Sequence, residues 1–84
     1  MFAVVGQWPV DGAMDSAQLT HIVDVVRQQA GFQRGYWGQV ADGRDVAHAF
    51  IVFDTQARAA DMAGGVRAAI PTASLGVIEI LAEA

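Results

Sequence analysis

The segment from Ala47 to Phe53 constrains the fold of this chain more than any other feature. It reads Ala-His-Ala-Phe-Ile-Val-Phe, with a large apolar side chain at each of its last four positions. Successive side chains of a β-strand point to opposite faces. Phe50 and Val52 therefore face one way, and Ile51 and Phe53 face the other. A strand that is apolar on both faces must be covered on both.

Strand and helix signals along the chain give the order β-α-β-β-α-β. A first helix is expected between the capping residue Asp15 and Gly31, and a second between a cap at Asp54 or Thr55 and Pro71. Within the second helix, Gly64-Gly65 costs about 1 kcal/mol per glycine and favours a kink or a frayed end. Apolar runs bounded by glycine, proline and aspartate predict strands at Phe2–Trp8, Phe32–Val40, Val46–Phe53 and Leu75–Leu81.

This order predicts a ferredoxin-like α+β fold in a single domain spanning residues 1–84, with two helices on one face of a four-stranded antiparallel sheet. The other face, carrying His48, Phe50 and Val52, is then expected to meet a second copy. Leaving these two apolar side chains and their neighbours wet would forgo roughly 6–10 kcal/mol. Face-to-face packing of two such sheets gives a dimeric α+β barrel. The Asp42-Gly43 turn leaves the strand register open by one residue, and a slip would exchange the faces.

Composition excludes several classes of function. The net charge is −4, cysteine is absent and all five basic residues are arginine. Thiol chemistry, thiolate metal sites and Schiff-base lysines are therefore excluded, and an acidic chain lacks the basic surface that binds nucleic acid. No stretch is long enough for a membrane span or resembles a signal peptide. We expect a cytoplasmic protein without a metal or a cofactor.

The string Arg34-Gly35-Tyr36-Trp37-Gly38 is the most distinctive motif of the chain. RNA-recognition domains share the βαββαβ order and carry an Arg-Gly-aromatic-Gly motif. In those domains, however, the longer motif belongs to the third strand, whereas this string lies on the second. The acidic charge of the chain also opposes RNA binding.

The same string, preceded by Ala30-Gly31-Phe32 and followed by Phe53-Asp54-Thr55, resembles the antibiotic-biosynthesis-monooxygenase-like domains of the dimeric α+β barrel superfamily. The resemblance covers nearly the whole chain. It implies either cofactor-free oxygenation of aromatic compounds or oxidative haem breakdown. Haem-degrading members use a histidine on the second helix, and this chain has no histidine between Thr55 and Ile70. The resemblance therefore favours a cofactor-independent monooxygenase or isomerase of a small hydrophobic or aromatic compound.

Such chemistry requires an apolar pocket and a few hydrogen-bonding groups. We expect the pocket between the helices and the sheet, with Tyr36, Gln7 and His48 as the candidate catalytic residues. Trp8 and Gln7 are expected at its mouth. The residues expected to line the pocket are Trp8, Trp37, Phe53, Met62 and Leu19.

The scarcity of acid–base pairs favours an alternative, a non-catalytic dimeric module that binds a small molecule or a partner. Aromatic residues in a small protein are also commonly core residues. His21 falls opposite the apolar stripe of its helix and is expected to be solvated. Glu79 is expected to guard an edge strand or, if it points inward, to act as a base. Arg34 is a candidate for pairing with an acid across the dimer.

Overall fold

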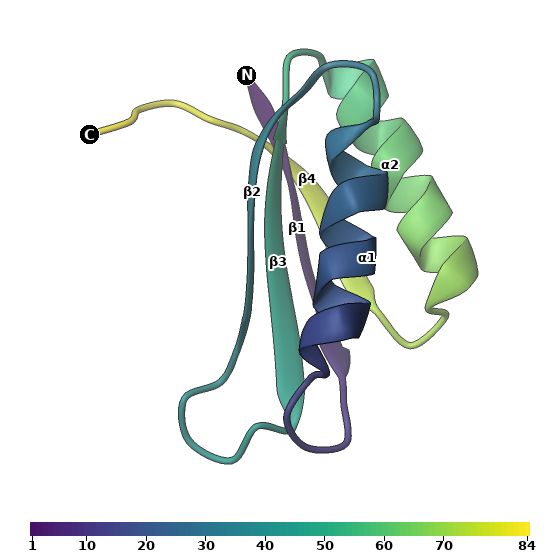
Figure 1. The fold of residues 1–84 in the computed structure, drawn as a ribbon. Coiled ribbons are helices and arrows are strands. Elements are labelled where there is room, and N and C mark those ends of the chain that lie inside the picture. Colours follow the sequence, from purple (N-terminus) through teal and green to yellow (C-terminus); the bar gives the residue numbers. More distant parts are fainter.

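The computed structural model describes all 84 residues, and its elements follow the expected order. The elements are β1 (Phe2–Pro9), α1 (Ser16–Arg27), β2 (Phe32–Gln39), β3 (Val46–Phe53), α2 (Gln56–Ala69) and β4 (Ser74–Glu79). The strands form one antiparallel sheet in the order β2-β3-β1-β4. Both helices cover the same face of this sheet (Figure 1). The fold is ferredoxin-like, as the sequence predicts.

Side-chain caps fix where both helices begin. The Asp15 carboxylate accepts a hydrogen bond of 2.8 Å from the backbone N–H of Ala17 at the start of α1. At α2 the sequence left Asp54 and Thr55 open, and Thr55 is the cap, because its hydroxyl accepts from the N–H of Arg58. Asp54 instead forms an ion pair of 2.9 Å with Arg58. These local bonds satisfy N–H groups that have no partner within the helix.

The structure departs most from the sequence-based expectation at the ends of α1 and β4 and at the glycine pair of α2. Helix α1 ends at Arg27 rather than near Gly31, because the chain already turns at Gln29, whose N–H bonds to the carbonyl of Val26. Strand β4 ends at Glu79 rather than Leu81, although one further bond joins the N–H of Ile80 to the carbonyl of Met1. The glycine pair neither kinks nor frays α2, which continues to Ala69.

Strand β3 lies inside the sheet, and its side chains alternate as expected. Ile51 and Phe53 point toward the helices and are 3% and 1% exposed. They form the core with Val4 of β1 and with the alanines of α2 that face the sheet, Ala59 and Ala63.

His48, Phe50 and Val52 point to the opposite, open face. The register is now fixed, because Phe50 pairs with Val5 on one side and Tyr36 on the other. Phe50 is half-buried, whereas Val52 is only 1% exposed within a single chain. The expectation that Val52 needs a second copy for its burial is therefore wrong.

An ion pair joins Arg34, which stands beside Val52 in the sheet, to Glu83. Arg34 lies on β2 at one edge of the sheet, and Glu83 follows β4 at the other edge. The chain end leaves the sheet on the side away from the helices (Figure 1), and the ion pair links it to β2. Val52 and Ala3 stand in the same row as Arg34. The pairing that the sequence suggested for Arg34 across a dimer is thus made within the chain.

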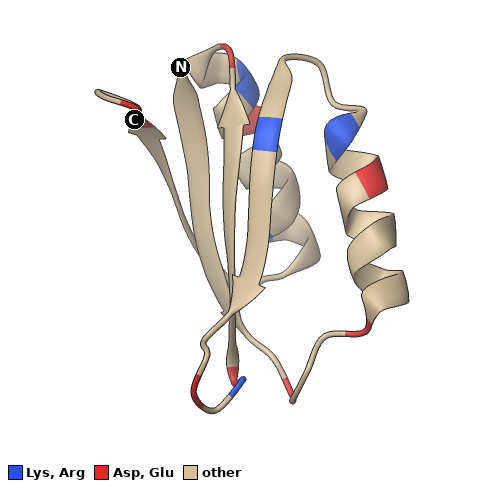
Figure 2. Cartoon of the chain, turned by 60° about the vertical axis from the view of Figure 1, so that its left-hand side comes forward, with Lys and Arg blue, Asp and Glu red and all other residues tan.

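Charge is almost absent from the sheet. The three longer strands are uncharged apart from one basic band on β2, and the other charges lie on helices, loops and chain ends (Figure 2). Beyond Arg34, the open face presents apolar groups, with Val5 38% and Tyr36 63% exposed. Glu79 is exposed at the end of the edge strand β4.

Replacement of Gly31 by alanine is expected to destabilise the fold strongly. Gly31 has a φ of +81°, and an added Cβ would overlap the Asp54 carboxylate and the Arg58 side chain. Gly12 has nearly the same φ, +82°, with nothing near an added Cβ, so it is the matched control. Gly12→Ala should cost about 1–2 kcal/mol, and Gly31→Ala roughly 1–3 kcal/mol more. Urea unfolding measures both, and equal losses would contradict the contact.

Candidate functional site

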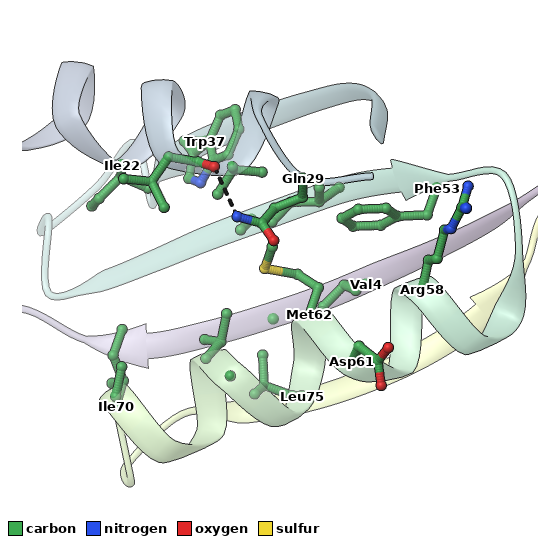
Figure 3. A pocket seen from close by; sticks show the side chains of 18 of the residues that line it. Val4, Ile22, Gln29, Trp37, Phe53, Arg58, Asp61, Met62, Ile70 and Leu75 are labelled. Carbon is green, nitrogen blue, oxygen red and sulfur yellow. Dashed lines mark hydrogen bonds between the residues drawn. The ribbon is translucent and has the colours of Figure 1, made fainter. Parts of the chain in front are cut away.

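A cavity separates the two helices above the sheet. No residue of α1 has its Cα atom within 8 Å of a Cα atom of α2. Helix α1 lies closest to β2, whereas α2 lies closest to β4, β1 and β3. The space left between the helices has a volume of 640 Å³, and the sheet forms its floor (Figure 3).

The wall of this cavity is mainly apolar. Of its 21 lining residues, 15 are hydrophobic, which makes it suited to an apolar ligand. The sheet contributes Val4, Gly6, Trp8, Trp37, Ala49, Ile51, Phe53 and Leu75, and the apolar side chains of the helices that line the cavity are Ile22, Val25, Val26, Met62, Val66 and Ala69.

The absence of a side chain at Gly35 determines where the indole of Trp37 lies. A Cβ added to Gly35, two residues earlier on the same face of β2, would lie 2.6 Å from Cη2 of the Trp37 indole. The ring therefore occupies the space above Gly35. The glycine of the Gly-Tyr-Trp string thus lets the Trp37 indole lie against the sheet, where it forms part of the cavity wall.

At the Phe53 end of the cavity the wall is closed by packed groups. The rings of Phe53 and Phe32 meet edge to face with centroids 6.3 Å apart. Arg58 stands at the same end in Figure 3, held by its ion pair with Asp54. Across the middle of the gap, the side chains of Met62 on α2 and of Gln29, just after the C-cap of α1, point toward one another.

Four polar side chains line the cavity, and all are exposed at its rim: His21, Gln29, Arg58 and Asp61. The amide of Gln29 donates to the carbonyl of Val25, and Arg58 pairs with Asp54. His21 and Asp61 make no hydrogen bond or ion pair within the chain. These two groups are the ones available to a ligand.

The structure brings together most of the residues that the sequence placed in a pocket. Trp8, Trp37, Phe53 and Met62 all line the cavity. Leu19 is half-buried but does not line it, because the cavity begins one turn further along α1.

The three side chains considered as catalytic candidates gather elsewhere, on the open face. Gln7 pairs directly with His48, and Tyr36 stands on the neighbouring row of β2. Gln7 was expected beside Trp8 at the mouth of the pocket. Adjacent strand residues point to opposite faces, so only Trp8 points into the cavity. Gln7, His48 and Ser74 instead border a shallow hollow of 290 Å³ on the open face.

Sequence reasoning missed the polar rim of the cavity. His21 was assigned to solvent because it lies outside the stripe of α1 that packs on the sheet. His21, Val25 and Gln29 form a second line at helical spacing, and Val25 is 46% exposed although apolar. An isolated valine between two polar groups was the available signal for a helix that borders a gap.

No group of three or more His, Asp or Glu side chains is arranged to hold a metal ion. None of the helices combines the length and the apolar character needed to cross a membrane.

Comparisons with known proteins support the fold. No family model and no curated protein matches the sequence. Among solved structures, the chain is similar to a single-residue variant of SnoaB, a cofactor-independent oxygenase from Streptomyces nogalater. The TM-score is 0.65 at 18% identity, over 98% of this chain and 94% of that one. At this identity the likeness shows a shared fold.

Replacing Gly35 by alanine is expected to displace Trp37. The added methyl group would meet the indole, and relief of that overlap should cost about 1–3 kcal/mol. Gly38, on the same strand with nothing within 4 Å of an added Cβ, provides the control. In a Trp8→Phe background, emission of Trp37 should shift in Gly35→Ala and stay unchanged in Gly38→Ala. An unshifted spectrum in both variants would show that Gly35 does not seat the indole.

Proposed function

We propose that the cavity binds a small, uncharged aromatic compound and that the protein oxygenates it without a cofactor. The observation that carries this proposal is the apolar space between the helices, walled by two tryptophans and a phenylalanine. Ligand cavities commonly have volumes of about 300–1,000 Å³, and this one is 640 Å³. The likeness in fold between this chain and the oxygenase SnoaB supports the proposed type of reaction.

Charge at the rim favours an uncharged ligand. Arg58 is neutralised by Asp54, which leaves Asp61 as the unpaired charged group of the wall. A carboxylate in the ligand would lose water in the cavity without gaining a cationic partner. Flat aromatic rings, by contrast, can pack against the indoles of Trp8 and Trp37.

The proposed reaction takes its electrons from the substrate itself. Oxidation of an activated methylene group to a carbonyl by O2 places one oxygen atom in the product. The other oxygen atom leaves as water with the two methylene hydrogens, so no external reductant is required. The reaction begins with loss of a proton, because the resulting anion passes an electron to O2 far more readily than the neutral compound.

His21 is the rim group suited to accept that proton. It lines the cavity from α1 and has no partner within the chain. Imidazole is the side chain that most often serves as a general base. Proton transfer alone, without O2, would make the same site an isomerase.

One observation favours a non-catalytic binding module as the second candidate. All four polar side chains of the cavity stand at its exposed rim, and its interior wall is apolar. Such a wall can hold a hydrophobic compound without reacting with it.

Oxygen uptake with a tricyclic anthrone tests the proposal. Without added cofactor, the wild-type protein should speed oxidation above the spontaneous rate and consume one O2 for each anthraquinone formed. His21→Gln should lower kcat by about tenfold or more, because it removes a proton acceptor. Asp24→Asn, one turn further along α1 and outside the cavity wall, is the matched control.

The outcomes separate the candidates. Saturable binding of the anthrone without faster oxidation would support the binding module. Product formed without O2 uptake would indicate an isomerase. A loss of turnover confined to Tyr36→Phe, Gln7→Leu or His48→Gln would move the reaction to the open face. Unchanged turnover in those three variants would remove the catalytic roles considered for them from the sequence.

We also propose that the protein is a homodimer joined through its open face. In the row next to that of Arg34, Val5, Phe50 and Tyr36 form an apolar patch in which Phe50 is half-buried and the other two are exposed. Ile78 of β4, at the far end of the row that contains Arg34, lies diagonally beside Val5 and is 45% exposed. If two sheets packed face to face, the apolar patch of each copy would be buried against the other, which favours self-association.

A lysine at the centre of this patch should break the dimer. Val5→Lys would place a charge against the apolar patch of the second copy, at a cost of several kcal/mol to association. Thr20→Lys, on the exposed outer side of α1, adds the same charge elsewhere. Light scattering over a dilution series should show dimers for wild type and Thr20→Lys and monomers for Val5→Lys. A monomeric wild type would refute the assembly.

A further inference from the structure

Helix α2 contains two glycines, Gly64 and Gly65, at positions where neither the backbone conformation nor close packing requires glycine. Glycines 6, 31 and 35 each leave room for a neighbouring side chain that an added Cβ would hit. At Gly64 and Gly65 nothing lies within 4 Å of an added Cβ, and neither has the positive φ that favours glycine. Glycine is unfavourable inside a helix, so packing and backbone geometry do not account for this pair.

The two glycines differ in what they face. Gly65 lines the cavity, together with Met62, Val66 and Ala69 at helical spacing. Both glycines are exposed, but Gly64 does not line the cavity. In Figure 3 the stretch of α2 between Met62 and Ile70 borders the cavity, and Gly65 lies within that stretch. The missing side chain at Gly65 therefore adds directly to the volume of the cavity.

We propose that Gly65 is a specificity-determining residue, whose bare Cα admits the far ring of an uncharged fused or linked aromatic ligand. With Ala69 one helical turn away, it makes a low part of the wall beside the larger side chains of Met62, Val66 and Ile70. Apolar side chains floor the cavity below α2, Val4 from β1 and Leu75 from β4. A ring seated there contacts backbone and methyl groups only, which suits an unsubstituted aromatic edge. This inference rests on the proposed binding function and adds the size limit of the ligand.

Two uncharged fluorescent probes of different size test the subsite. N-phenylnaphthylamine has three rings and naphthol two, and binding of either is followed by energy transfer from Trp8 and Trp37. Gly65→Leu should weaken binding of the three-ring probe by about tenfold or more, because the leucine fills the proposed subsite. Binding of naphthol should fall by about threefold or less, since a smaller ligand can lie elsewhere in the cavity.

Gly64 supplies the matched control. Gly64→Leu adds the same side chain at the adjacent position, with the same gain in helix propensity, but outside the cavity. Its affinity for both probes should equal that of wild type. Gly65→Ala is the smaller step and should give an intermediate loss for the three-ring probe. Circular dichroism confirms that each variant is folded before titration.

Each result has a definite meaning. Size-dependent weakening in the Gly65 series alone supports the subsite. Wild-type affinity for the three-ring probe in folded Gly65→Leu overturns it and leaves the proposed binding function standing. Equal losses in the Gly64 and Gly65 series would also overturn it, because the effect would then belong to the helix as a whole. Failure of the wild-type protein to bind either probe would overturn both proposals.

Discussion

Burial of β3 on both faces is the constraint on which the rest of this structure depends. Toward the helices, Ile51 and Phe53 anchor the core and form part of the floor of the cavity. Toward the open face, Val52 is covered within its own chain and Phe50 only in part. An interior position between β2 and β1 is the one in which a strand of this composition pairs along both edges. The other strands and both helices are arranged around it.

The cavity follows from the way in which each helix is attached. Helix α1 is fixed by the Asp15 cap and by packing of Val26 on the core, whereas α2 is fixed by Thr55 and by Ala59 and Ala63. The alanines bring α2 close to the sheet, while the distance between the helices is left to the width of the sheet. The Cα atoms of the two helices stay more than 8 Å apart, and the space between the helices remains available to a ligand.

The sequence was sufficient to predict the order of elements and the alternation of β3, because strand periodicity and helix caps are local signals. It also placed Trp8, Trp37, Phe53 and Met62 around one cavity. It could not show that Arg34 reaches Glu83, a contact between residues 49 apart, nor that Val52 is buried within its own chain. The cavity-lining role of His21 was missed for a similar reason. An apolar stripe on a helix shows which side of the helix packs on the sheet. It does not show whether the side next to the stripe faces solvent or borders a cavity.

Separate attachment of the two helices has a consequence for how such a protein diversifies. Val25, Gly65 and Ala69 line the gap and are exposed, so they are not part of the close-packed core. Substitutions at these positions are therefore relieved of most of the stability cost that accompanies changes in a close-packed core. Selection for a new ligand can act on them one at a time while β3 and its neighbours keep the fold. The division between a close-packed floor and adjustable walls makes this small scaffold evolvable.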